Sequence, residues 1–162
     1  MEIKTKIVPC LWFDDQAERA AKFYTSIFKG KILKTTHYTE AGSEIHGRPA
    51  GSVMTVEFEL AAQRFTALNG GPIFKFTEAI SFQVMCDTQE EVDYFWSKLC
   101  EGGQEGPCGW LKDKFGLSWQ VVPTIMGDLF ADGAKNSGKV MQAMLKMKKL
   151  DIAELKRAQA GK

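Results

Sequence analysis

The chain has 162 residues, of which 44% are hydrophobic and 25% are charged, and its net charge is +1. This length and composition are those of a globular protein with one hydrophobic core. The near-neutral charge gives no electrostatic basis for binding nucleic acid or a membrane surface, and no apolar stretch approaches the length of a membrane span.

The first residues, MEIKTKIVPCLWF, have neither the uncharged apolar segment nor the cleavage site of a signal peptide. We therefore expect a cytoplasmic protein. The cysteines are Cys10, Cys86, Cys100 and Cys108, and no two of them form a Cys-x-x-Cys pair. Their irregular spacing predicts reduced thiols rather than a zinc or redox site.

The first predicted elements are a strand over IVPCLWF and an amphipathic helix after it. Asp15, with Glu18 three residues later, predicts a capped helix start, and Gly30 is expected to end the helix. Its apolar residues fall on one stripe, which consists of Ala17, Ala20, Ala21, Tyr24 and Phe28. Three alternating segments follow, KILKTTHYTE, SVMTVEFEL and RFTALNGG, and each of them predicts a strand.

The second half of the chain repeats this order. With a shift of 72 positions, LWFDDQAERAAKFYTSIF aligns with QVMCDTQEEVDYFWSKLC, so that Asp15 and Glu18 align with Asp87 and Glu90. The run ISFQVMC predicts a strand, a helix follows it, and three shorter strands fit the Gly-rich remainder up to LSWQVVP. The sequence thus predicts an α+β fold of two βαβββ modules within residues 1–123, at about 1–72 and 79–123.

Residues 124–162 form a C-terminal tail with helical spacing. Its apolar residues are Val140, Met144, Met147, Ile152 and Leu155. Asp151 and Glu154 make a new capping box, which predicts two short helices with a break near Leu150. We expect this helical extension to pack on the same domain or on a second subunit.

Three stretches carry a resemblance to a known superfamily: LWFDDQAERAAKFYTSIF, LNGGPIFKFTEAISFQV and GWLKDKFGLSWQVVP. In a paired βαβββ arrangement they resemble the vicinal oxygen chelate superfamily, which includes the glyoxalase, bleomycin-resistance and dioxygenase proteins. Within it the chain resembles the PhnB-like, glyoxalase-like branch, some of whose members are labelled 3-demethylubiquinone-9 3-methyltransferase. The resemblance implies a cleft shared by the two modules and a homodimer.

In metal-using relatives, the cleft holds a divalent ion that polarises the oxygens of a small substrate. The resemblance implies ligands on the first and last strand of each module. The first-strand positions fall on Pro9 and Ser81. The last-strand positions fall on Gln120 and on Asn69, or on Ala67 or Leu68 if the register slips. None of these is His, Glu or Asp, so the sequence does not support a metal site and predicts no cofactor.

Strand alternation predicts a cleft lined by apolar side chains with a few amides and hydroxyls. The predicted ligand-binding residues are Leu11, Phe13, Asn69, Ser81, Gln83, Met85, Ser118 and Gln120. This lining suits a small organic ligand with one or two oxygens. The alternative is that the amides satisfy one another or the backbone within a closed core. Trp12 and Trp119 are expected on the opposite, helix-covered face.

Two functions remain open from the sequence. The first is a glyoxalase-like or dioxygenase-like enzyme that acts on a small oxygenated or aromatic molecule, with catalytic residues unknown. The second is a non-catalytic small-molecule binding or resistance protein of the bleomycin-resistance type. Methyl transfer is not expected, because the chain has no Gly-rich strand-to-helix turn of the kind that holds a nucleotide-derived methyl donor. His37 and His46 are expected to be exposed loop residues.

Overall fold

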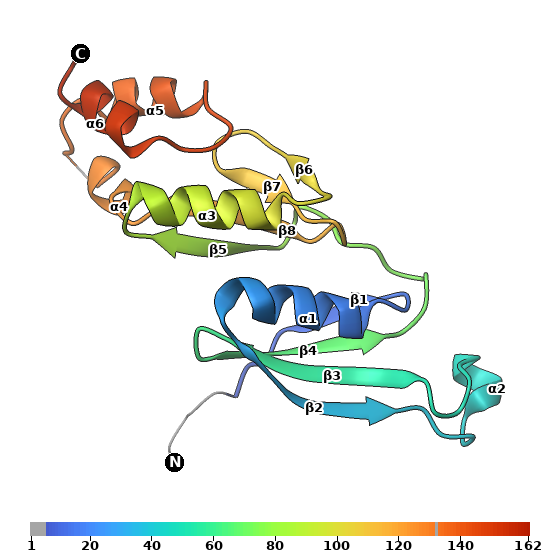
Figure 1. Cartoon of the computed structure of the whole chain (residues 1–162). Helices are drawn as coiled ribbons and strands as arrows, with labels where there is room; N and C mark the ends of the chain where they lie inside the picture. The colour runs from blue at the N-terminus through green and yellow to red at the C-terminus, as the bar shows by residue number, and fades with distance from the viewer. Residues whose placement is uncertain (1–5, 132) are drawn as a thin grey trace. The chain divides into compact units, whose positions relative to one another are not determined.

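The computed structural model describes residues 6–131 and 133–162, and the elements follow the predicted order (Figure 1). The chain divides into two compact units, Met1–Lys75 and Phe76–Lys162. Each unit contains one four-stranded mixed sheet with a helix packed on it. The predicted α+β repeat is therefore confirmed.

The first unit contains β1 (Cys10–Phe13), α1 (Ala17–Phe28), β2 (Lys31–His37), the one-turn α2 (Ser43–His46), β3 (Val53–Leu60) and β4 (Gln63–Asn69). Its strand order is β1-β4-β3-β2, with β1 parallel to β4 and the other pairs antiparallel. Helix α1 buries Ala17, Ala20, Ala21, Tyr24 and Ile27 on one face of this sheet. Ile27 takes the buried place predicted for Phe28, which is only half-buried. In each unit, we call the face of the sheet opposite the packed helix the open face.

The second unit begins with β5 (Ser81–Cys86), α3 (Gln89–Leu99), β6 (Gln104–Glu105), β7 (Trp110–Lys112) and β8 (Ser118–Pro123). Its strand order, β5-β8-β7-β6, is that of the first unit, again with the first pair parallel. Helix α3 buries Val92, Trp96 and Leu99. The sheet side chains buried on this face are Val84, Cys86, Leu111, Trp119 and Val121.

The C-terminal tail adds α4 (Met126–Leu129), α5 (Ser137–Met144) and α6 (Ile152–Gln159). These helices enclose a small core of Leu129, Val140, Leu150, Leu155 and Ala158. Backbone hydrogen bonds join the tail to the rest of the second unit: Cys108 N donates to Met147 O (2.8 Å) and Gly109 N donates to Lys148 O (2.7 Å). The side chain of Gln89 also donates to Leu150 O (3.2 Å) and accepts from Ile152 N (2.9 Å). In the part of the chain that the structure describes, no helix is long and apolar enough to cross a membrane.

The helix starts differ in part from the prediction. Asp151 caps α6 as predicted, because its carboxylate accepts from Glu154 N (2.8 Å). Asp87 does not cap α3; the cap is Thr88, whose hydroxyl accepts from Glu91 N (3.2 Å). Asp15 does not cap α1 either, since the N-cap residue is Gln16 and makes no side-chain cap bond. Both Asp residues lie one position before the N-cap, where a side chain does not reach the first free N–H groups as a cap does.

Candidate functional site

The candidate site is the open face of the sheet in the second unit. Alternation places Ser81, Gln83 and Met85 of β5 on this face, opposite the buried Val84 and Cys86. The register pairs Ser81 with Ser118 and Gln83 with Gln120 on β8. On the other side of β8, Trp110 pairs with Gln120 and Lys112 pairs with Ser118. Because cross-strand partners share a face, side chains of β5, β8 and β7 form one continuous surface.

Gln120 lies at the centre of this surface and is held by its neighbours. Its Nε2 donates to Ser81 Oγ (2.8 Å), and its Oε1 accepts from Gln83 Nε2 (3.4 Å). The amide is therefore oriented by hydroxyl and amide partners rather than by a charge. Gln83 and Met85 remain exposed, and Met85 has 53% of its surface accessible.

Ser118 is the exceptional residue of the face. It is 1% exposed, and its hydroxyl is a buried side-chain group with no hydrogen-bond partner among the described residues. Ser118 also lines a cavity of about 440 Å³. The other lining residues are Glu78, Gln104, Glu105, Gly106, Pro107, Trp110, Leu111 and Lys112. This volume lies in the range of small-molecule sites.

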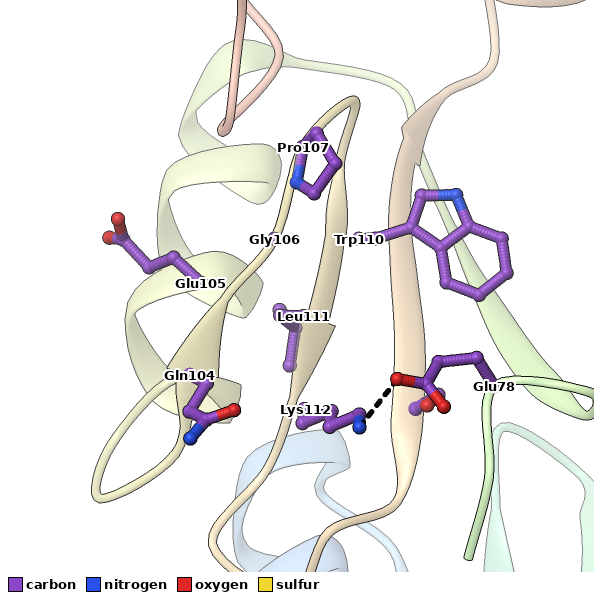
Figure 2. A pocket seen from close by; sticks show the side chains of 9 residues that line it. Glu78, Gln104, Glu105, Gly106, Pro107, Trp110, Leu111 and Lys112 are labelled. Atoms are coloured by element: carbon purple, nitrogen blue, oxygen red, sulfur yellow. Dashed lines mark ion pairs between the residues drawn. The ribbon is translucent and has the colours of Figure 1, made fainter.

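An ion pair crosses the edge of the cavity (Figure 2). Lys112 Nζ on β7 lies 2.5 Å from a carboxylate oxygen of Glu78, which belongs to the connection between β4 and β5. The hydrogen bond from Lys112 lowers the pKa of the Glu78 carboxyl, which favours the charged form of that carboxyl. Trp110 extends from the same strand as Lys112, two residues earlier.

In the first unit, three predicted site residues lie on the helix-covered face. Leu11 and Phe13 are 6% and 3% exposed and belong to the core under α1. Asn69 is 6% exposed; its Oδ1 accepts from Ala17 N (2.8 Å) and its Nδ2 donates to Val53 O (3.0 Å). The prediction that these side chains line the cleft face is wrong for this unit. Asn69 follows instead the alternative in which a buried amide satisfies the backbone.

The cause is a difference of one residue between the repeats. Three residues separate β1 from α1, whereas two separate β5 from α3. The helices therefore align at a shift of 72, but the strands align at 73, so that Leu11 and Phe13 correspond to Val84 and Cys86. A slip of one residue moves each side chain to the other face of a sheet.

The same one-residue shift makes the prediction for Trp12 wrong. Trp12 lies on the open face rather than under α1, and its indole N–H donates to Gly71 O (2.8 Å). Trp119 lies under α3 as predicted, 3% exposed, with its indole N–H donating to Asp113 Oδ2 (2.8 Å).

The positions at which the resemblance implies metal ligands do not fit a metal here. Asn69 is occupied with two backbone partners, and Gln120 bonds Ser81 and Gln83. Pro9 contributes only a backbone carbonyl, which accepts from Thr66 N (2.9 Å). Within residues 6–131 and 133–162, no three side chains of His, Cys, Asp or Glu come together as a metal site. Neutral amides and hydroxyls alone make a weak set of ligands for a divalent cation.

Sequence reasoning missed Glu78, Gln104 and Lys112 as cavity residues. Strand alternation could have predicted Lys112, because it follows Trp110 by two positions and so lies on the same face. No sequence pattern predicts Glu78, since it lies in an irregular connection that carries no periodicity.

A second contact that the sequence does not predict lies in the first unit. Loop packing brings Arg48 to Asp14, with Nη2 3.0 Å from Oδ1, although 34 positions separate them.

Comparison with known proteins identifies the family. A profile of the family described as 3-demethylubiquinone-9 3-methyltransferase matches residues 5–122. The chain is similar to a solved PhnB protein from Bacillus cereus titled with the same methyltransferase name, with 34% identity, a TM-score of 0.63, and coverage of 74% of this chain and 99% of that chain. No protein of curated function matches.

Two more distant structures show the fold alone. Protein PA1353 from Pseudomonas aeruginosa has 19% identity and a TM-score of 0.60, over 74% of this chain and 98% of that chain. The fosfomycin resistance protein FosX from Listeria monocytogenes has 13% identity and a TM-score of 0.51, over 75% of this chain and 94% of that chain. The chain therefore belongs to the 3-demethylubiquinone-9 3-methyltransferase family, as does the PhnB protein it is similar to.

Proposed function

We propose that the second unit binds a small oxygenated or aromatic molecule in the cavity on its open face. The single observation that supports this most directly is the hydroxyl of Ser118, which is buried, makes no hydrogen bond among the described residues, and lines the cavity. Leaving a buried hydroxyl without a partner costs about 1–3 kcal/mol. An oxygen of a bound molecule relieves that cost, whereas an apolar filling of the cavity does not.

The rest of the cavity suits the same class of ligand. Trp110 offers an aromatic surface, and Gln104 offers an amide on the neighbouring strand. The predicted residues Ser81, Gln83, Met85 and Gln120 continue the face beyond Ser118, and we propose that they contact larger ligands. Leu11, Phe13 and Asn69 have no part in this proposal, because they lie under α1.

The proposed role is binding by protein groups in place of a metal ion. The ionisable side chains that line the cavity are all paired, Glu78 with Lys112 and Glu105 with Lys148, an arrangement that favours holding a ligand over acid–base catalysis. We further propose that the protein is cytoplasmic, as expected from its N-terminal sequence, and that it acts as a homodimer, as the family resemblance implies. Light scattering on the eluting protein tests the dimer, and a monomer at all concentrations would contradict it.

The test is a thermal-shift screen with small aromatic and oxygenated compounds, followed by titration of intrinsic tryptophan fluorescence. A compound present at 100 times its dissociation constant is expected to add about 2.7 kcal/mol of stability. Ser118→Ala should weaken the compounds that bind in the cavity by about five- to tenfold, the worth of one hydrogen bond. Ser97→Ala on the exposed side of α3 is the matched control and should bind as wild type does. Equal binding by wild type and Ser118→Ala would overturn the proposed site.

A further inference from the structure

The cavity carries an asymmetry of charge that bears on what it binds. Its lining contains one cation, Lys112, and two carboxylates, Glu78 and Glu105. Glu105 is engaged elsewhere, because it accepts from Trp96 Nε1 (3.2 Å) on α3 and lies 3.4 Å from Lys148 Nζ in the tail. Lys112 is therefore the charged donor of the cavity, and its ammonium group is paired with the carboxylate of Glu78.

The two members of this ion pair are held very differently. Lys112 belongs to β7 and is paired in register on both sides, with Gln104 and with Ser118. Glu78 belongs to a turn, and its side chain is 61% exposed against 36% for Lys112. An exposed ion pair contributes little to stability, so Glu78 can leave Lys112 at a small cost.

Lys112 and Ser118 place two donors next to each other. They are cross-strand partners on the same face, so an ammonium group and a buried hydroxyl both lie along one small region of the cavity wall. A carboxylate offers two acceptor oxygens, one for each donor. Trp110 lies two residues from Lys112 along the strand, about 7 Å away, which suits a planar ring attached to that carboxylate.

Building on the proposed binding function, we propose that the cavity takes a small aromatic carboxylate. Its carboxylate replaces that of Glu78 at Lys112 Nζ and accepts from Ser118 Oγ, while its ring packs on Trp110. Glu78 then turns to solvent, so that the ion pair acts as a latch that an anionic ligand opens and a neutral one does not. No covalent bond is made or broken in this step.

The test compares three matched probe pairs on the full chain: benzoate with benzamide, phenylacetate with phenylacetamide, and 3-phenylpropionate with its amide. We expect at least one acid to bind about tenfold more tightly than its amide. Lys112→Met should remove that preference, whereas Lys98→Met, which makes the same change on an exposed position of α3, should keep it. Glu78→Gln should tighten binding of the acid by about two- to fivefold and leave the amide unchanged, with Glu101→Gln as its control.

The outcomes separate this inference from the proposed function. Acids and amides that bind equally, with both weakened by Ser118→Ala, would overturn the carboxylate latch and keep the cavity as a binding site. Acid binding that Glu78→Gln weakens would also overturn the latch. Failure of all three acids overturns the inference, and failure of the whole compound screen overturns the proposed function. Circular dichroism and melting temperature confirm that each variant is folded before it is titrated.

Discussion

Asn69 joins three elements of the first unit through one side chain. Its Oδ1 accepts from Ala17 N at the start of α1, and its Nδ2 donates to Val53 O at the start of β3. Gln16 makes no cap bond, so the amide from β4 takes over the function of an N-cap from 52 positions away. Asn69→Ala should therefore loosen the start of α1 and its attachment to the sheet.

The size of the effect follows from these contacts. Loss of an N-cap interaction costs about 0.5–2 kcal/mol. Loss of the second hydrogen bond costs about 0.5–1.5 kcal/mol. Ala17 is fully buried, so water reaches its freed N–H poorly and the cost lies toward the upper part of each range. We expect Asn69→Ala to lower the free energy of unfolding by about 2–3 kcal/mol, which is about 1–2 M in urea midpoint.

Urea unfolding followed by circular dichroism measures this change. Gln63→Ala is the control, because it removes an exposed amide from the same strand and should change the free energy of unfolding by less than about 0.5 kcal/mol. Hydrogen exchange of the Ala17 amide by NMR gives a second, local readout and should speed up in Asn69→Ala. Unchanged protection of that amide, or a stability loss no larger than that of Gln63→Ala, would refute the capping role.

Three further predictions concern the second unit. Asp113→Ala should cost about 3–5 kcal/mol in urea unfolding, because the buried carboxylate accepts from Phe115 N, Leu117 N and Trp119 Nε1; a loss below 1 kcal/mol would contradict this. Leu150→Ala should cost about 2–5 kcal/mol, since Leu150 is 1% exposed in the tail core; an unchanged melting temperature would mean that the tail does not stabilise the unit. Burial raises the pKa of the Cys86 and Cys100 thiols to about 11, so the folded state keeps protons that the unfolded state loses, and stability should fall between about pH 9 and pH 11. The double variant Cys86→Ala, Cys100→Ala should flatten that slope in unfolding measured under reducing conditions, and an identical slope would contradict the assignment.

The repeated architecture could be predicted because it rests on local patterns. Alternating strands, two apolar helix stripes and Gly-rich punctuation are properties of neighbouring residues, and they predicted the order of the main elements in both units. The break near Leu150 and the cap at Asp151 were also correct, since a capping box is a local signal. The one-turn helices α2 and α4 were not predicted, because four residues are too few to show a period.

The candidate site was predictable in one unit only. In the second unit, the face of β5 did not depend on how the two repeats are aligned. Alternation around the buried Val84 already places Gln83 on the open face. In the first unit, the face of β1 was inferred from its alignment with β5. One extra residue before α1 shifts that alignment, so the inferred face was the wrong one. Glu78 reaches Lys112 from an irregular segment 34 positions away, a contact that no local pattern contains.

The extra residue before α1 and the role of Asn69 are linked by the duplicated architecture. Asn69 pairs with Phe13 as Pro123 pairs with Cys86, so the two residues occupy equivalent places at the ends of β4 and β8. Proline has no side-chain acceptor, and α3 is capped by its own Thr88. In the first unit the cap comes from the sheet, and the connection does not have to supply a capping side chain. The two repeats therefore satisfy the first N–H groups of their helices differently, and this difference coincides with the extra residue before α1.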